Sequence, residues 1–379
     1  MNRSAQIPIG VFLTRFQPGG TERQMIELVR RLDPQRFKVH VACFHREGNW
    51  LPRVLERAAS VVEFPIHGFA RPATVRQLLT FARWCRRERL AVVQTCDLYA
   101  NTFGLPGAAL AGIPLRIGSR RELNPDKTPW QIRTQRAAYR FATKVVANSP
   151  AAVRLLRQEG IAAGSIALIP NGLDLSAFAD RKPAAPIRTI VTVANLRPEK
   201  SHETLIAAAG RLVPSHPELR FQVVGDGPRR RHLEALVAAR GLAARVEFLG
   251  HREDVPAILA SADAFVLPSR SEAFPNSAIE AMAAGLPVIA SEVGGLVDLI
   301  DHGRTGLLVP PGDSDAIASA LHSLIADAAR ASALGRAARA DVQQRYSFER
   351  MVASFEHLYL SGLRRRVSES SPRMETAGV

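Results

Sequence analysis

Short apolar runs alternate with amphipathic stretches along most of the chain. Runs rich in Val, Ile and Leu predict strands, and stretches such as residues 22–32 and 75–87 have apolar residues at helical spacing. This alternation is typical of α/β units with parallel sheets. The strands predicted in the first half are IPIGVFL, KVHVACF, AVVQTC, LRIGSR and TKVVANS. Those predicted in the second half are TIVTVANL, RFQVVGDG, RVEFLG, AFVLPS, PVIASE and GLLVP.

A break in this pattern divides the chain. Residues 180–188 (DRKPAAPIR) place two prolines among small and charged residues, as linkers do. We therefore predict two similar α/β domains, which suits a length of 379 residues. Residues 346–363 have the spacing of an amphipathic helix, and residues 364–379 have the composition of a disordered tail.

Composition and targeting signals exclude several classes of protein. Apolar residues make up 46% and charged residues 22%, which is typical of a globular protein, and no apolar run is long enough for a membrane-spanning helix. The apolar patch near the start is too short and too soon followed by Arg15 for a secretory signal, so we expect a cytoplasmic protein. Three cysteines without a CxxC pair predict neither a disulfide framework nor a metal site.

The net charge of +15 comes from the N-terminal half: 29 Lys and Arg against 13 Asp and Glu up to Ile190 give +16, and the remaining residues give −1. Segments 83–89 (RWCRRER) and 133–144 (RTQRAAYRFATK) predict basic helix faces without the aromatic residues that stack on bases. Two interpretations stay open, a solvated helix surface and a face for anionic phospholipid headgroups. A nucleic-acid partner is not expected.

Two glutamates flank a proline in SRSEAFPNSAIEAM, residues 269–282. Proline favours the first helical turn, so Pro275 predicts a helix start, with Glu272 in the loop and Glu280 on the helix. A buried strand precedes this loop, which places it at the carboxyl edge of a parallel sheet, where ligands bind. Amides near Ser277 suit a diphosphate, Glu280 suits ribose, and Glu272 suits a second hydroxyl-rich group. Alternatively, one glutamate stabilises the helix dipole and the other is solvated.

Three further segments could bind phosphate or sugar. Arg197 and Lys200 follow the strand TIVTVANL, where they could neutralise a diphosphate. Gly225 and Gly227 permit a tight turn near a base or ribose, and the paired glycines ending at Gly20 permit close approach of the backbone to a ligand. Each segment also has a structural interpretation as an ordinary charged or strand-to-helix turn.

Four motifs occur in order along the chain: GGTE at 19–22, NLRPEK at 195–200, GDGP at 225–228, and the stretch from SE at 271 to AMAAGLPV ending at 288. Together they resemble the family 4 retaining glycosyltransferases of the GT-B fold, up to about Leu363. The resemblance implies an α/β protein with two Rossmann-like domains facing a deep interdomain cleft. An acceptor-binding domain at 1–180 would be followed by a nucleotide-sugar-binding domain at 181–345, and the helix at 346–363 would cross back to the first domain.

The resemblance also implies an activity. A sugar would pass from a nucleotide-sugar donor, with UDP expected before GDP, to a glycan or lipid-linked acceptor in cell-surface polysaccharide or glycolipid biosynthesis, with retention and without a required metal. Positions matching Arg197, Lys200 and Glu272 would serve catalysis, with Glu272 contacting the donor sugar. The remaining donor-binding positions match Gly20, Gly225, Gly227, Phe274, Asn276, Ser277 and Glu280.

The acceptor side departs from the family. Many relatives carry a histidine where this chain has Ile117–Arg121, so the acceptor candidates are Asp97, Tyr99 and Arg120, each of which could instead be structural or solvated. Two alternatives to a transferase stay open, a catalytically silent nucleotide-sugar-binding subunit of a glycan assembly complex and a sugar-nucleotide epimerase. A glycosidase is disfavoured, because nearby cations and glycine turns suit a nucleotide better than a carboxylate pair alone would. An anionic membrane surface is a further expected partner.

Overall fold

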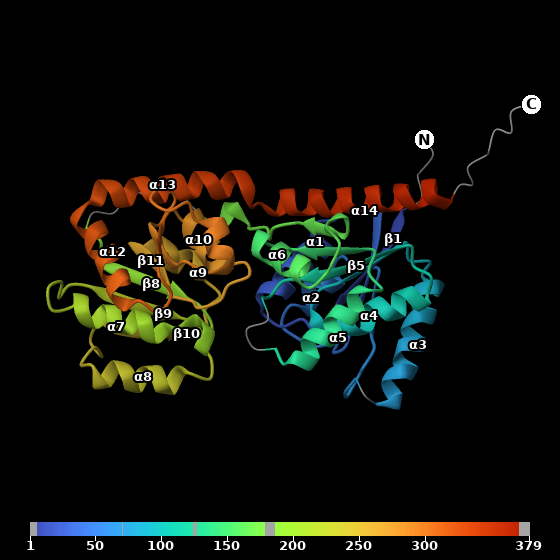
Figure 1. The fold of residues 1–379 in the computed structure, drawn as a ribbon, viewed down its shortest axis with the longest axis horizontal. Coiled ribbons are helices and arrows are strands. Elements are labelled where there is room, and N and C mark those ends of the chain that lie inside the picture. Colours follow the sequence, from blue (N-terminus) through green and yellow to red (C-terminus); the bar gives the residue numbers. More distant parts are fainter. Residues whose placement is uncertain (1–5, 70, 124–126, 179–185, 371–379) are drawn as a thin grey trace, which may run out of the picture. The chain divides into compact units, whose positions relative to one another are not determined.

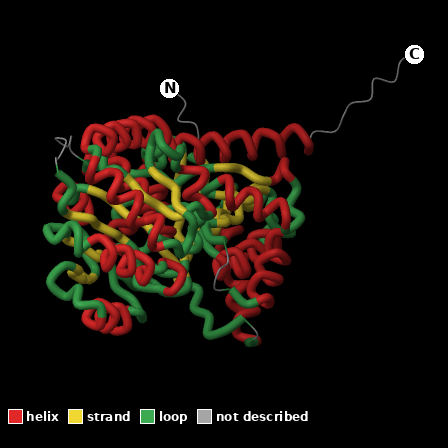
Figure 2. The backbone as a smooth tube through the Cα atoms, turned by 60° about the vertical axis from the view of Figure 1, so that its left-hand side comes forward, coloured by secondary structure: helices red, strands yellow, loops and turns green. Residues whose placement is uncertain are grey.

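The computed structural model describes residues 6–69, 71–123, 127–178 and 186–370. The chain forms two compact units (Figure 1). Unit 1 contains Met1–Asn148, Ala152–Pro170 and Phe348–Val379, and unit 2 contains Ser149–Ala151 and Asn171–Ser347. In each unit, helices flank a sheet (Figure 2), which confirms the predicted pair of Rossmann-like domains.

Unit 1 contains a parallel sheet of seven strands in the order β3-β2-β1-β4-β5-β6-β7. Strand order reverses between β1 and β4, which creates a topological switch point at the carboxyl ends of these two strands. The strands are β1 (Ile7–Leu13), β2 (Phe37–Cys43), β3 (Ser60–Glu63), β4 (Val92–Thr95), β5 (Leu115–Arg120), β6 (Lys144–Ala147) and β7 (Ile166–Leu168).

The helices of unit 1 include the last helix of the chain. They are α1 (Gly20–Arg31), α2 (Leu51–Leu55), α3 (Pro72–Arg87), α4 (Leu98–Leu110), α5 (Pro129–Tyr139), α6 (Pro150–Gln158), whose first residues fall in unit 2, and α14 (Phe348–Ser370), with a 3-10 turn at Ala163–Ser165. The apolar face of α14 lies in the same core as β1 and β4, including the fully buried Phe355 and Tyr359. The Tyr359 hydroxyl donates to Gln94 Oε1 over 2.5 Å, which fixes α14 against β4.

Unit 2 repeats this topology with six parallel strands in the order β10-β9-β8-β11-β12-β13, so its switch point lies between β8 and β11. The strands are β8 (Thr189–Val193), β9 (Arg220–Val224), β10 (Val246–Gly250), β11 (Ala264–Leu267), β12 (Val288–Ser291) and β13 (Leu307–Val309). The helices are α7 (His202–Leu212), α8 (Arg230–Ala239), α9 (Val255–Ser261), α10 (Asn276–Ala283), α11 (Gly294–Leu299), α12 (Ser314–Ala326) and α13 (Ala328–Arg345), with 3-10 turns at Leu175–Ala177 and Pro198–Lys200.

Two sequence boundaries differ from the structure. Residues 171–178 were expected in the first domain, but they belong to unit 2, because Leu173 and Phe178 are buried in its core. The tail predicted from residue 364 begins as helix, since α14 continues to Ser370. The sequence offers no proline before Pro372 to end this helix. Part of the predicted linker and residues 371–379 lie outside the described residues.

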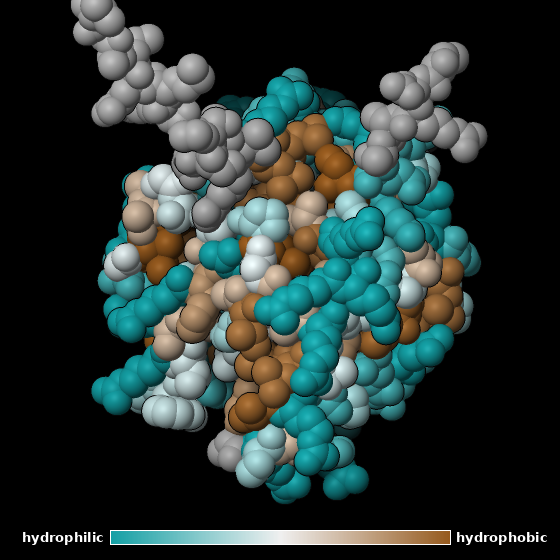
Figure 3. Space-filling model, turned by 90° about the vertical axis from the view of Figure 1, so that its right-hand side faces the viewer, coloured by the Kyte–Doolittle hydropathy of each residue, from teal (hydrophilic) through white to brown (hydrophobic). Residues whose placement is uncertain are grey.

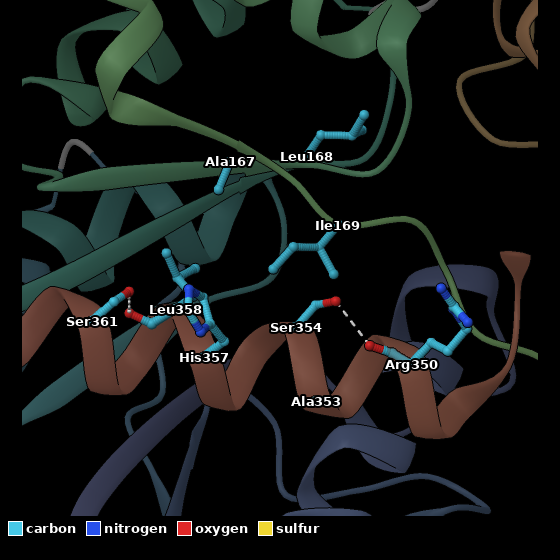
Figure 4. Close-up of a pocket in the computed structure, with 9 residues that line it drawn as sticks. All are labelled: Ala167, Leu168, Ile169, Arg350, Ala353, Ser354, His357, Leu358 and Ser361. Atoms are coloured by element: carbon cyan, nitrogen blue, oxygen red, sulfur yellow. Dashed lines mark hydrogen bonds between the residues drawn. The ribbon is translucent and has the colours of Figure 1, made fainter.

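A cavity of about 500 Å³ lies in unit 1 between the edge strand β7 and α14 (Figure 4). None of the predicted site residues lines it; its walls are Ala167, Leu168, Ile169, Arg350, Ala353, Ser354, His357, Leu358 and Ser361. Among the helices that the structure describes, none combines the length and the hydropathy needed to cross a bilayer.

Candidate active site

Two loops meet at the switch point of unit 2. One leaves β8 and carries the 3-10 turn Pro198–Lys200, and the other leaves β11 and leads to α10. Because parallel neighbouring strands end at the same edge of a sheet, these loops lie side by side. The amide of Arg270 donates to the carbonyl of Glu199 over 2.7 Å, which joins the loops through their backbones.

An ion pair links the same two loops. Lys200 Nζ lies 2.6 Å from Glu272 Oε1, and the two side chains are only 21% and 8% exposed. The hydroxyl of Ser269 donates to the same carboxylate oxygen over 2.8 Å. Two donors therefore hold Glu272 in one orientation, and Lys200 is held at the carboxyl edge. The sequence placed both residues in the site, but it did not indicate that they pair, and it missed Ser269 three residues before Glu272.

The residue that follows Lys200 has an uncommon backbone conformation. Ser201 lies in the left-handed region, with φ of 50°, which few residues other than glycine adopt. Its hydroxyl is 2.9 Å from the hydroxyl of Thr204 and accepts from Arg270 Nε over 3.3 Å. These contacts hold the loop in a shape that turns directly from Lys200 into α7.

Arg197 offers a second cation in the same loop. It precedes the 3-10 turn and is exposed. Within the part of the chain that the structure describes, its guanidinium makes no ion pair or side-chain hydrogen bond. Arg197 is therefore available to an anionic ligand, whereas Lys200 is already neutralised in part by Glu272.

The helix start predicted at Pro275 is confirmed, because Pro275 is the residue before α10. The start of a helix carries its positive dipole end and suits an anion. In α10 the amides of Asn276 and Ala278 already donate to the carbonyls of Phe274 and Pro275, each over 3.1 Å, so the amide of Ser277 is the one placed for a ligand. Asn276 is fixed there by Asn171, whose Nδ2 donates to Asn276 Oδ1 over 2.9 Å, and Phe274 packs edge-on against Tyr346 at 5.6 Å. Ser277 is half-buried beside Asn276, and Glu280 is buried one turn further along the helix.

Gly295, in the first turn of α11, lies so close to the Glu272 loop that only glycine fits there. The amide of Gly295 donates to the carbonyl of Glu272 over 2.7 Å, and a Cβ at Gly295 would lie 2.1 Å from the carbonyl oxygen of Ala273. The loops after β11 and β12 therefore touch through their backbones, which leaves no space for a side chain there.

The Gly225 and Gly227 turn also has a structural cause. Gly225 has φ of 133°, and a Cβ there would lie 2.0 Å from the carbonyl oxygen of Ala194. A Cβ at Gly227 would lie 2.7 Å from the carbonyl oxygen of Leu196. These glycines let the loop after β9 pack against the loop that carries Arg197 and Lys200. The loops after β8 and β9, both predicted to bind the donor, therefore lie in contact. Gly225 and Gly227 are half-buried.

Unit 1 carries the remaining predicted residues at its own switch point and nearby. Gly20 begins α1 after β1 and is exposed. Asp97 follows β4 and caps α4 by accepting from the amide of Ala100 over 2.8 Å, while its other oxygen accepts from the Thr14 hydroxyl over 2.6 Å. Tyr99, two residues later, is 40% exposed. Asp97 and Tyr99 thus lie at the edge where ligands bind.

The side chain of Arg120 does not face this edge, although Arg120 is the last residue of β5. It is fully buried, donates to Gln135 of α5, and forms an ion pair with Glu159 after α6. The prediction of Arg120 as an acceptor residue does not fit this position, because its guanidinium faces the helices that cover the sheet.

Two charged groups of unit 1, Glu22 and Arg121, have shifted pKa values. Burial raises the pKa of Glu22 above its usual value, and the charge of Asp97 adds to this, although its own backbone and the nearby Arg15 and Arg121 oppose it. Burial also lowers the pKa of Arg121 to about 10. No group of three or more His, Cys, Asp or Glu that could hold a metal ion occurs within the described ranges.

Solved structures share this architecture. HepE from Anabaena, solved in complex with UDP-glucose, superimposes with a TM-score of 0.82 at 24% identity, over 94% of this chain and 100% of HepE. Sucrose-phosphate synthase from Thermosynechococcus elongatus superimposes with a TM-score of 0.80 at 24% identity, over 97% of this chain and 100% of the synthase. These likenesses confirm the predicted GT-B fold.

Family models identify the class more narrowly. Residues 18–177 match the model described as Glycosyltransferase Family 4, and residues 187–327 match the model described as Glycosyl transferases group 1. Together the two matches cover most of the chain and support a GT-B glycosyltransferase.

Curated relatives match over part of their length. A 2-deoxystreptamine glucosyltransferase of Streptomyces kanamyceticus is 29% identical over 76% of this chain and 81% of its own. A glycogen synthase of Mycobacterium tuberculosis is 32% identical over 55% of this chain and 51% of the synthase. An exopolysaccharide phosphotransferase of Streptomyces coelicolor is 35% identical over 55% of this chain and 22% of the phosphotransferase. The chain thus spans about half or less of the length of the last two.

Proposed function

We propose that the protein is a retaining glycosyltransferase that moves a hexose from a UDP-sugar to a glycan or lipid-linked acceptor in cell-surface polysaccharide or glycolipid biosynthesis. The observation that carries the proposal is the pairing of Lys200 with Glu272 at the switch point of unit 2, beside the exposed Arg197 and the start of α10. HepE, solved with UDP-glucose, supports UDP as the nucleotide.

Each donor-site group has a chemical role in this proposal. The leaving diphosphate gains negative charge in the transition state, so cations and helix amides placed in advance lower the barrier without a metal. Arg197 and the amide of Ser277 at the start of α10 bind the diphosphate. Lys200 moves part of its interaction from Glu272 to the phosphate. Glu272, freed on one side, accepts from a hydroxyl of the donor sugar, and Glu280 accepts from ribose.

Substitutions separate binding from catalysis. Glu280→Ala is expected to weaken donor binding, and Lys200→Ala is expected chiefly to slow transfer, because its contact strengthens as the leaving group departs. Arg231→Ala, an exposed cation on α8, is the matched control and should leave both unchanged. Unchanged kinetics in both site variants would refute the donor site.

The donor is found by a thermal-shift screen of UDP- and GDP-sugars, since a ligand at 100 times its dissociation constant adds about 2.7 kcal/mol to stability. The product's anomeric configuration, measured by NMR with an accepted substrate, tests retention. Activity that survives chelation of divalent metals is expected, and its loss would contradict the metal-free mechanism.

A silent nucleotide-sugar-binding subunit is the second candidate, and the position of Arg120 favours it, because the region where relatives carry a histidine is occupied here by a buried ion pair. Transfer by the purified protein would exclude this candidate. Formation of a second UDP-sugar without any acceptor would instead indicate an epimerase. We place the enzyme in the cytoplasm, where three buried cysteines without disulfides are expected to stay reduced.

A further inference from the structure

Two helices of unit 1 carry basic charge that the donor site does not use. The sequence of α3 contains four arginines and that of α5 contains two, and neither helix contains an acidic residue. Arg76, Arg83 and Arg133 are exposed, and none forms an ion pair with a described residue. This surface is therefore strongly positive at neutral pH.

Large apolar side chains protrude from the same helices. Val75 and Leu79 lie one turn apart on α3 and are 59% and 40% exposed. Trp130, in the first turn of α5, is 71% exposed. Exposed aliphatic and indole groups among arginines are typical of segments that lie in a membrane interface.

Contacts connect the start of α5 with the start of α3 through Tyr99 and the loop at Phe69. Gln131 Nε2, next to Trp130, reaches the Tyr99 hydroxyl at 3.5 Å, and the Tyr99 ring stacks on Phe69 at 6.1 Å. The carbonyl beside Phe69, that of Gly68, accepts from the Thr74 hydroxyl of α3 over 2.6 Å. Figure 3 turns the side of unit 1 that carries α3 towards the viewer and shows apolar side chains between polar ones. We name this surface the docking face; it consists of Phe69, Val75, Arg76, Leu79, Arg83, Tyr99, Trp130 and Arg133.

We propose that the docking face binds the surface of an anionic lipid bilayer. The arginines meet the lipid headgroups, and Val75, Leu79 and Trp130 enter the boundary between headgroups and acyl chains. A saccharide would use the flat rings but has no use for two protruding aliphatic side chains. The inference rests on the proposed function only in that membrane binding would bring unit 1 to a lipid-linked acceptor. The membrane binding itself can be measured without any sugar transfer.

Co-sedimentation of the full chain with vesicles tests the charge. Vesicles of phosphatidylcholine are compared with vesicles containing 30 mol% phosphatidylglycerol (about a third anionic), in low and high salt. Each Lys or Arg near such a surface is worth about 1 kcal/mol, or about fivefold in partitioning, so the double variant Arg76→Glu, Arg83→Glu should lose about 25-fold or more. The matched control, Arg231→Glu with Arg240→Glu, makes the same charge change on exposed positions of unit 2 and should lose much less.

A second set of variants tests the apolar part. Serine at Val75, Leu79 and Trp130 should weaken vesicle binding at least about tenfold, because each buried apolar side chain contributes to partitioning. The control places serine at Leu55, Leu168 and Val297, which are 46%, 46% and 44% exposed elsewhere, and should bind as the unmodified protein does.

Three results would overturn the docking face. Binding that ignores vesicle charge and salt removes the electrostatic basis, and equal losses in the two charge-reversal variants indicate a diffuse effect of net charge. A serine triple variant that keeps vesicle binding but loses affinity for a saccharide acceptor indicates a carbohydrate platform instead. Donor binding is also measured for every variant without vesicles. Normal donor binding in a variant that loses vesicle binding shows that the docking face, and not the donor site, is affected.

Discussion

His202 is an ionisable side chain buried at the start of α7, two residues after Lys200. It is 1% exposed, and neither ring nitrogen has a hydrogen-bond partner among the residues that the structure describes. Burial lowers the pKa of the imidazole from 6.5 to about 4; the charge of Glu203 opposes this shift, and that of Lys200 adds to it. The folded protein therefore holds His202 neutral across a range in which the unfolded chain binds a proton.

The pKa difference sets the size of the effect. Stability from this group is complete above pH 6.5 and is lost as the pH falls towards 4, because only the unfolded state gains the proton. The difference of about 2.5 pKa units corresponds to about 3.4 kcal/mol at most, with about 2 kcal/mol of it lost between pH 7.5 and pH 5.0.

Urea unfolding of His202→Leu measures this loss. Leucine cannot titrate and leaves no unpartnered nitrogen, so the variant should be at least as stable at pH 7.5 and should lose about 2 kcal/mol less than the unmodified protein at pH 5.0. The three tryptophans, Trp50, Trp84 and Trp130, belong to unit 1, so fluorescence follows unit 1 and circular dichroism is needed for unit 2. His232→Leu, at an exposed position, is the control. Equal acid sensitivity in the His202 variant and the unmodified protein would refute the reasoning.

Two further substitutions test packing. Arg120→Met leaves Glu159 buried without its cation, so it should lower the free energy of unfolding by about 3 to 5 kcal/mol. Urea unfolding followed by tryptophan fluorescence measures this loss, and adding Glu159→Leu should recover most of it. A loss under about 1 kcal/mol in the single variant would contradict this prediction. Gly295→Ala places a Cβ against the Ala273 carbonyl and should weaken donor binding about tenfold or more in thermal-shift titration. The control is Gly210→Ala, whose Cβ would meet only Leu242 at 3.8 Å and should leave donor binding unchanged. Equal donor affinities of the two variants would argue against a rigid contact at Gly295.

Much of the fold could be predicted because buried parallel strands are continuous apolar runs. All eleven predicted strands are present, since each contains buried apolar residues that stand out in the sequence. The two strands that the sequence did not reveal, β3 and β7, are the edges of the sheet in unit 1. Neither strand contains a fully buried residue, and Leu168 of β7 is 46% exposed, so their apolar pattern is weak.

The sequence predicted which loops form the donor site, but not which of their residues touch one another. A strand followed by Arg197 and Lys200, and another followed by Glu272, both indicate the carboxyl edge of a sheet. That the two strands are neighbours depends on the strand order, which places β11 beside β8 although some seventy residues separate them in the sequence. The pairing of Lys200 with Glu272 follows from this order, so it became visible only in the structure.

Arg120 and Lys200 show why position after a strand is not enough to assign a site residue. Arg120 is the last residue of β5 and still pairs with β6 in the ladder. Its side chain therefore points to one face of the sheet, where it meets the covering helix α5. Lys200 lies beyond the end of β8, where the chain has left the ladder and turns over the carboxyl edge. Asp97 and Tyr99 likewise lie beyond β4. A polar residue inside the ladder is therefore a candidate for the core, and one beyond it is a candidate for the ligand, which leaves Asp97 and Tyr99 as the acceptor residues to test.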